Sequence, residues 1–257
     1  MHLTDTHIHL YAEEFSLELD QLIADAQDTG VSRMLLPNID LTSVEGMFKL
    51  VDEHPEMCYP MVGLHPCYVK EDYQEQLTKL KFILENNLNR VVAIGEIGLD
   101  FYWDLTFRKQ QEQAFLMQLE WAEQHQLPIS IHSRESTAEL LELLLSYGEG
   151  KVKGVFHCFS GNIEQANEAI RLGFMLGIGG VVTFKKASLA DIVTDIPVEH
   201  LILETDGPYL APTPHRGKRN NPAYLRLVAE KVAELKSISV EEVACVTSAN
   251  AARLFHL

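Results

Sequence analysis

The sequence predicts a TIM-type (β/α)8 barrel, an α/β fold in which eight parallel strands alternate with helices. Short β-branched and aliphatic runs alternate with longer amphipathic segments along the whole chain, as expected of βα units around a parallel sheet. The length of 257 residues matches the usual size of such a barrel. Several of the short runs show little polar alternation, which is typical of strands covered on both faces.

The apolar runs predict eight strands, at residues 2–6, 33–37, 59–64, 91–95, 128–131, 152–156, 174–177 and 201–204. The amphipathic segments between them predict helices, among them residues 16–29, 74–86, 107–125, 136–147 and 162–172. Residues 240–255 are expected to form an extra C-terminal helix that packs on the outside. No repeat, low-complexity tract or linker interrupts the pattern, so residues 1–257 are expected to form a single domain.

A doubly wound open sheet is the alternative fold. Such a sheet usually carries a glycine-rich phosphate turn after its first strand. This chain instead reads Thr6-His7-Ile8-His9 at that position, so a dinucleotide site is not expected.

Charge and composition limit the classes of partner. The chain has 21 Lys and Arg against 37 Asp and Glu, a formal net charge of −16. So acidic a surface argues against broad electrostatic capture of duplex DNA, although a narrow site could still take a strand end. No apolar run reaches the roughly 18–20 residues that span a bilayer, and the N-terminus lacks the features of a signal peptide. The chain has four cysteines and no C-x-x-C pair, so we expect a cytoplasmic protein. We also expect no membrane partner and no obligate protein partner.

Side chains that can bind metals follow most of the predicted strands. In a barrel, the C-terminal strand ends converge on one mouth, where the active site lies. In chain order these ends carry His7 and His9, Asn38, His65, Glu96, His132, His157 and Asp206. Chance placement is a poor account of so many imidazoles and carboxylates at one set of strand ends. The pattern therefore predicts a metal site at the mouth.

The histidines support this prediction in two ways. His7 and His9 lie two residues apart, so both imidazoles share one face of an extended strand and can reach one metal. Asp206 ends the last strand, which neighbours the first in a closed barrel. His132 and His157 each follow an apolar strand; either one alone could be a buried core histidine, but two on successive strands favour ligation.

Two carboxylates at the mouth could take part in chemistry. Glu96, flanked by glycine, could bridge two cations, or it could form a salt bridge with an arginine. Asp206 could bind a metal and accept a proton from water, or it could only cap a turn. Glu204 is either an orienting group or an outward surface charge.

Several other residues near the mouth could contact a substrate. His65 could contact a phosphate, protonate a leaving group or hydrogen-bond within its own loop. Arg134, the Lys185–Lys186 pair and the basic run at 215–220 suit a compact anionic substrate, although the lysine pair could equally be a solvated helix start. Three aromatic residues could stack a base at the rim or close over the core: Tyr102, Trp103 and Tyr209.

The motifs occur in a specific order: D-T-H-x-H at 5–9, G-x-H-P at 63–66, G-E-I-G-L-D at 95–100, I-H-S-R at 131–134, H-C-F-S-G at 157–161, E-T-D-x-P-Y-L at 204–210, R-G-K-R-N-x-P at 216–222 and N-x-x-x-L-F at 250–255. In this order they resemble the TatD family of metal-dependent deoxyribonucleases, among the amidohydrolase-like barrels, over nearly the whole chain. The chain departs from the family pattern at Asn221, where many members have glutamate, and after His9, and neither departure removes a metal-binding side chain.

The resemblance implies a set of roles. One to three divalent cations would be held by His7, His9, Glu96, His132, His157 and Asp206. Glu96 would bridge cations, Asp206 would lie near the attacking water, and His65 and Arg134 would approach the substrate phosphate.

We therefore expect a divalent-metal phosphodiesterase, a DNase that trims single strands or ends. The expected catalytic residues are Asp206, His65 and Glu96, and the expected substrate contacts are His65, Arg134, Lys185 and Tyr209. The alternatives are a hydrolase of small esters, lactones or amides at the same site, and a catalytically silent metal-binding or adaptor protein, against which the complete ligand set argues. Imidazole ligands favour zinc or manganese and phosphodiester chemistry favours magnesium or manganese, so the metal stays open among Zn, Mn and Mg.

Overall fold

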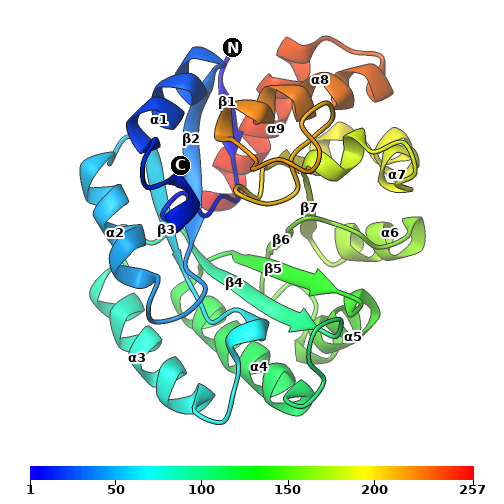
Figure 1. Ribbon diagram of the computed structural model, residues 1–257. Helices are drawn as coiled ribbons and strands as arrows, with labels where there is room; N and C mark the ends of the chain where they lie inside the picture. Colours follow the sequence, from blue (N-terminus) through cyan, green and yellow to red (C-terminus); the bar gives the residue numbers. More distant parts are fainter.

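A parallel sheet that curls into a nearly closed barrel forms the centre of the computed structural model, which describes residues 1–257 (Figure 1). The eight strands are neighbours in chain order and every adjacent pair is parallel. They are β1 (Leu3–Asp5), β2 (Val31–Pro37), β3 (Cys58–Val62), β4 (Ala93–Asp100), β5 (Ile129–Arg134), β6 (Gly154–Phe156), β7 (Phe174–Ile178) and β8 (Leu201–Leu203). The first and last strands meet where the Thr6 amide donates to the Leu203 carbonyl at 3.0 Å. The predicted TIM-type barrel is confirmed.

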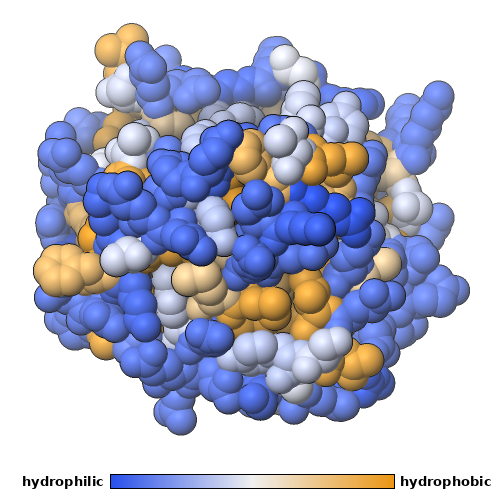
Figure 2. All heavy atoms as spheres, turned by 90° about the horizontal axis from the view of Figure 1, so that it is seen from below, coloured by the Kyte–Doolittle hydropathy of each residue, from blue (hydrophilic) through white to orange (hydrophobic).

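Nine α-helices accompany the strands, and most of them surround the barrel (Figure 1). They are α1 (Leu19–Asp28), α2 (Val44–Glu53), α3 (Tyr73–Asn86), α4 (Arg108–His125), α5 (Thr137–Tyr147), α6 (Ile163–Arg171), α7 (Leu189–Asp195), α8 (Leu225–Lys236) and α9 (Val240–Phe255). Figure 2 shows the molecule from the side on which α3 and α4 lie, and hydrophilic side chains cover most of this face around a hydrophobic patch. None of the helices is both long and apolar enough to cross a membrane.

Strand β4 is longer than the sequence pattern predicts. The expected strand ends at Gly95, but the observed strand continues to Asp100, so Glu96 lies within it and not after it. The pairing of β4 with β5 shifts register in this region. Glycine is needed there because a Cβ atom on Gly95 would lie 2.8 Å from the Ser130 Cβ atom of the neighbouring strand. The close approach of the two strands brings Glu96 and the polar end of β5 together.

The C-terminal helix α9 does more than pack on the outside. Its side chains Ala251 and Phe255 are buried in one cluster with a residue each from β2, β3, β4, β6 and β8, namely Leu35, Met61, Ala93, Val155 and Ile202. Strands from all around the barrel can share a cluster only inside it. The extra C-terminal helix is confirmed, and it also reaches inward, because the ring of Phe255 joins this interior cluster.

Candidate metal centre

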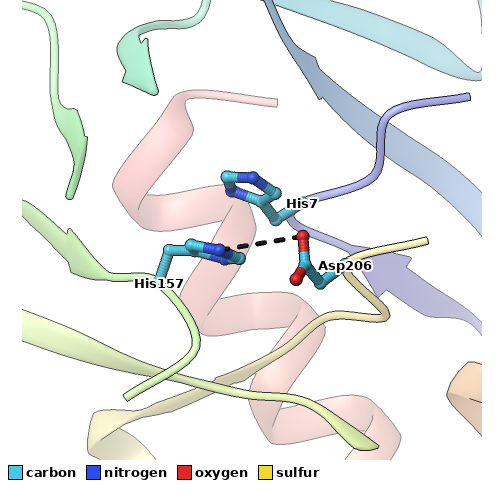
Figure 3. Close-up of side chains that lie close together, drawn as sticks. All are labelled: His7, His157 and Asp206. Carbon is cyan, nitrogen blue, oxygen red and sulfur yellow. Dashed lines mark ion pairs between the residues drawn. The ribbon is translucent and has the colours of Figure 1, made fainter. Parts of the chain in front are cut away.

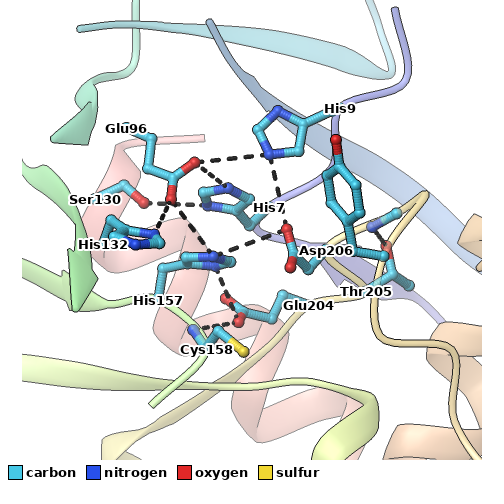
Figure 4. A network of polar contacts seen from close by, with 12 residues as sticks. His7, His9, Glu96, Ser130, His132, His157, Cys158, Glu204, Thr205 and Asp206 are labelled. Atoms are coloured by element: carbon cyan, nitrogen blue, oxygen red, sulfur yellow. Dashed lines mark hydrogen bonds and ion pairs between the residues drawn. The ribbon is translucent and has the colours of Figure 1, made fainter. Parts of the chain in front are cut away.

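Glu96 lies at the centre of a group of buried imidazoles at the mouth of the barrel. Its side chain is almost fully buried. Its two oxygens lie 2.8–3.7 Å from one nitrogen each of five histidines, which are His7, His9, His65, His132 and His157. Figure 4 shows four of these rings around the Glu96 carboxylate. No arginine or lysine contacts Glu96, which removes the interpretation of this residue as a partner of a nearby arginine.

The side chains form three sets of donor atoms that could each hold a metal ion, and within each set the donor atoms lie within 4.8 Å of one another. The sets are His7, His157 and Asp206 (Figure 3), then His7, His9 and Glu96, and finally His65, Glu96 and His132. His7 belongs to two of them, and so does Glu96. His65, which the sequence suggested as a catalytic and substrate-contacting residue, also lies in one of these sets. Its Nδ1 accepts from the Cys67 amide at 3.1 Å, so the Nε2 that lies 3.3 Å from Glu96 carries the proton of a neutral ring.

Buried partners indicate which nitrogen carries a proton in His9 and in His132. The Tyr11 hydroxyl donates to the Pro37 carbonyl at 2.6 Å, so at His9 Nδ1, 3.0 Å away, it can only accept. A neutral His9 thus carries its proton on Nδ1 and directs the lone pair of Nε2 towards Glu96, 3.6 Å away. Orienting partners of this kind are typical of metal-binding histidines.

His132 follows the same arrangement with its nitrogens exchanged. Its Nε2 lies 2.9 Å from Asp100 Oδ2, which leaves Nδ1 facing Glu96 Oε1 at 2.8 Å. Burial would raise the pKa of Asp100, but hydrogen bonds with His132 and with backbone amides outweigh it and lower that pKa to about 2. A charged Asp100 therefore holds the proton on the outer nitrogen. Burial would lower the pKa of His132, but its hydrogen bonds with Asp100 and Glu96 outweigh this and raise that pKa, so positive charge is favoured between the two carboxylates and either a proton or a bound cation supplies it.

Burial keeps two of the imidazoles neutral. It lowers the pKa of His9 to about 4 and that of His7 well below its usual value. Neutral imidazole is the form that binds a metal. Desolvation would raise the pKa of Glu96, but the surrounding histidines outweigh it and keep that pKa well below its usual value. His7 and His9 thus present nitrogen lone pairs beside a charged carboxylate, a donor set that fits a divalent cation.

Glu204 is an orienting group and not a surface charge. Its side chain is fully buried, and one oxygen lies 3.1 Å from His157 Nδ1. Burial would lower the pKa of His157, but the carboxylates of Glu204, Glu96 and Asp206 outweigh it and raise that pKa to about 10. This position therefore favours positive charge, which either a proton or a bound metal supplies. The side chains of His157 and Glu204 both lie close to Asp206, as Figure 4 shows.

Asp206 has the carboxylate most open to solvent in this group. Its side chain is 12 % exposed, against 3 % for Glu96 and 0 % for Glu204. One of its oxygens lies 3.7 Å from His9 Nε2 and 3.8 Å from His157 Nε2, and the carboxylate accepts no hydrogen bond from the protein. It is therefore free to contact a cation or a water molecule at the mouth.

The expected substrate contacts are spread over the rim. The Arg134 guanidinium lies over the rings of Tyr102 and Trp103, with distances of 4.0 and 5.1 Å to the ring centroids. The exposed ring of Tyr209 lies 6.1 Å from the His9 ring. Lys185 is exposed and forms neither a hydrogen bond nor an ion pair.

Sequence reasoning missed two of the residues that orient ligands. They are Tyr11, which belongs to the segment after His9 where the chain departs from the family pattern, and Asp100, which ends the motif at 95–100. Both roles depend on contacts with residues distant in the chain, namely Pro37 for Tyr11 and His132 for Asp100. The one local signal is the position of each residue just beyond a proposed ligand on the same segment.

A barrel whose mouth gathers buried imidazoles and carboxylates defines the class of metal-dependent barrel hydrolases. Within this class the chain belongs to the TatD family, since the family model described as TatD related DNase matches residues 4–256. It is 38% identical over 256 residues to the metal-dependent hydrolase YabD of Bacillus subtilis, covering 99% of each chain. It is 31% identical over 259 residues to the 3'-5' ssDNA/RNA exonuclease TatD of Erwinia tasmaniensis, covering 98% of this chain and 99% of the other.

Solved structures agree with this assignment. The crystal structure of YjjV, a TatD homolog from Escherichia coli K12, superposes with a TM-score of 0.93 at 28% identity and covers 99% of this chain and 98% of the other. The protein is therefore a metal-dependent hydrolase of the TatD family.

Proposed function

We propose that this enzyme is a phosphodiesterase that removes nucleotides from the ends of single-stranded DNA. The observation that carries the proposal is the sharing of His7 and Glu96 between adjacent donor sets. Shared ligands place cations close together, and closely spaced cations are typical of enzymes that cleave phosphoesters, nucleases among them. The exonuclease named among the relatives supports the same substrate class.

Each residue then has a proposed task. The residues that would hold one to three divalent cations are His7, His9, Glu96, His132, His157 and Asp206. Bound cations would lower the pKa of a water molecule and polarise the phosphodiester.

Asp206 would accept the proton of the attacking water, because its carboxylate is the most exposed of the group and has no hydrogen-bond donor from the protein. His65, whose Nε2 lies 3.3 Å from Glu96 and whose side chain is only partly buried, would approach the phosphate or the leaving oxygen. Arg134 and Tyr209 would contact the substrate at the rim.

The test is digestion of end-labelled single-stranded DNA by protein that is first stripped of metal and then given Mg²⁺, Mn²⁺ or Zn²⁺ separately. Closed circular duplex DNA, a chromogenic ester, a lactone and an amide form the comparison panel. We expect metal-dependent shortening of the single strand from its ends and much slower attack on the closed circle. Efficient hydrolysis of the ester, lactone or amide without hydrolysis of DNA would overturn the proposal in favour of a small-molecule hydrolase.

A further inference from the structure

Two loops that leave the mouth beside the metal centre are joined to each other. One follows β7 and the other follows β8. The Thr213 amide of the second loop donates to the Thr183 hydroxyl of the first at 2.8 Å, and the Arg216 guanidinium lies 4.5 Å from the centroid of the Phe184 ring. These contacts hold the two loops side by side, as the yellow and orange segments in Figure 1 show.

The joined loops carry a concentration of unpaired positive charge. Lys185, Lys186, Arg216 and Lys218 are all exposed, and none forms an ion pair; we call these four residues the basic ridge. Many basic residues elsewhere have an acidic partner, such as Lys79 with Glu75 at 2.7 Å. The neighbouring Arg219 is excluded from the ridge because it pairs with Glu18. In a chain with a net charge of −16, four unpaired cations on two adjoining loops need an explanation.

The two loops that carry the ridge both begin at the catalytic mouth. Asp206 and Tyr209 precede Arg216 on the same loop, and the first loop starts directly behind this segment, because a Cβ atom on Gly180 would lie 2.2 Å from the Leu210 carbonyl oxygen. In barrels of this type, the loops after the seventh and eighth strands frequently form a phosphate site. Unpaired exposed lysines gain little from one another and much from a polyanion.

We propose that the basic ridge binds the backbone phosphates of single-stranded DNA nucleotides next to the one that is cleaved. This inference rests on the proposed function and makes it more specific, since the preferred substrate becomes a polynucleotide several residues long and not a dinucleotide or a small phosphodiester. Contacts of this kind neutralise phosphates without reading bases, so the preference depends on length and salt and not on sequence.

The experiment compares two variants with the same loss of charge. The ridge variant is Lys185→Ala/Lys186→Ala/Lys218→Ala; Arg216 is kept because its contact with Phe184 helps to join the loops. The control variant is Lys49→Ala/Lys81→Ala/Lys153→Ala, which changes lysines on α2, on α3 and before β6. Metal content and thermal stability are measured first for both.

Binding is then followed by fluorescence anisotropy with a labelled 20-nucleotide single strand whose terminal linkages are phosphorothioates. Each phosphate that the protein neutralises contributes a slope of about −0.7 to a plot of log K against log salt for single strands. The ridge variant lacks three lysines, so between roughly 50 and 200 mM salt the wild-type affinity should fall about 20-fold more than the affinity of the ridge variant. The control variant should keep the wild-type slope. In the wild type, the KM for the 20-mer should be lower than the KM for a dinucleotide. In the ridge variant, the two KM values should be similar.

The outcomes separate the two proposals. Equal salt slopes for the ridge and control variants, or a KM independent of length in the wild type, would refute the ridge while leaving DNA hydrolysis standing. A smaller salt slope in the ridge variant alone supports the ridge as a site that binds single-stranded DNA. If the wild type then hydrolyses no DNA, the proposed function fails, and with it the position of the ridge next to a cleaved nucleotide.

Discussion

Replacement of Asp206 by Asn should separate chemistry from metal binding better than any other single change. The carboxylate is the most exposed of those at the centre and accepts no hydrogen bond from the protein, while lying 3.7 Å from His9 Nε2 and 3.8 Å from His157 Nε2. Asparagine keeps the shape and one weak oxygen ligand but removes the basic oxygen. Loss of a general base typically costs a hundredfold or more in turnover, or about 2.7 kcal/mol of transition-state stabilisation.

The assay measures kcat for single-stranded DNA together with metal content by elemental analysis. We expect kcat to fall at least about a hundredfold while much of the bound metal remains. Asp104→Asn is the matched control, because it makes the same change in a rim carboxylate that pairs only with Lys70 at 3.4 Å. Near-normal kcat in Asp206→Asn with metal retained would refute the assignment and leave His65 or Glu96 as the group that activates water.

Three further predictions concern the metal shell and the barrel interior. Glu96→Gln should sharply reduce metal content, since this carboxylate lies within 3.7 Å of five imidazoles; full metal stoichiometry measured by elemental analysis would contradict its role as a ligand. Tyr11→Phe removes the hydroxyl that orients His9 and should weaken metal affinity about 10–100-fold in a competition with a chelator, and an unchanged affinity would show that the orientation is set elsewhere. Phe255→Ala should lower the free energy of unfolding by about 3–5 kcal/mol in urea, whereas Phe82→Ala on the exposed face of α3 should change it by less than about 0.5 kcal/mol; similar losses in both would argue against the interior position of the ring.

The strands, and the gathering of the candidate ligands at their C-terminal ends, could be predicted from the sequence for one shared reason. The apolar strands of a barrel all end at one mouth. A polar residue directly after such a strand, as His157 is after β6, is therefore predicted to lie at the mouth. The interpretation went wrong where glycine was taken as the end of a strand. Gly95 is instead required inside β4 by the close approach of β5, and this places Glu96 within the strand.

The roles of the orienting residues could not be predicted because they depend on contacts across the fold. Glu204 lies two residues before the candidate ligand Asp206, and this spacing is equally compatible with a surface and an interior side chain. Only the packed structure places Glu204 3.1 Å from His157. The substrate side is harder still. The sequence around a lysine such as Lys185 is the same whether the side chain is only solvated or belongs to a phosphate-binding loop. Only the packed structure shows that its loop lies beside a second basic loop, and this proximity indicates a binding role.

The position of Phe255 has a consequence for how the chain folds. This ring packs in the interior of the barrel with residues from five strands, from Leu35 of β2 to Ile202 of β8. Contacts between segments so far apart in the sequence form slowly, because the entropy of closing a long loop is lost before the contact stabilises the fold. The interior of the barrel is therefore completed only when α9 docks on strands that all precede it in the chain.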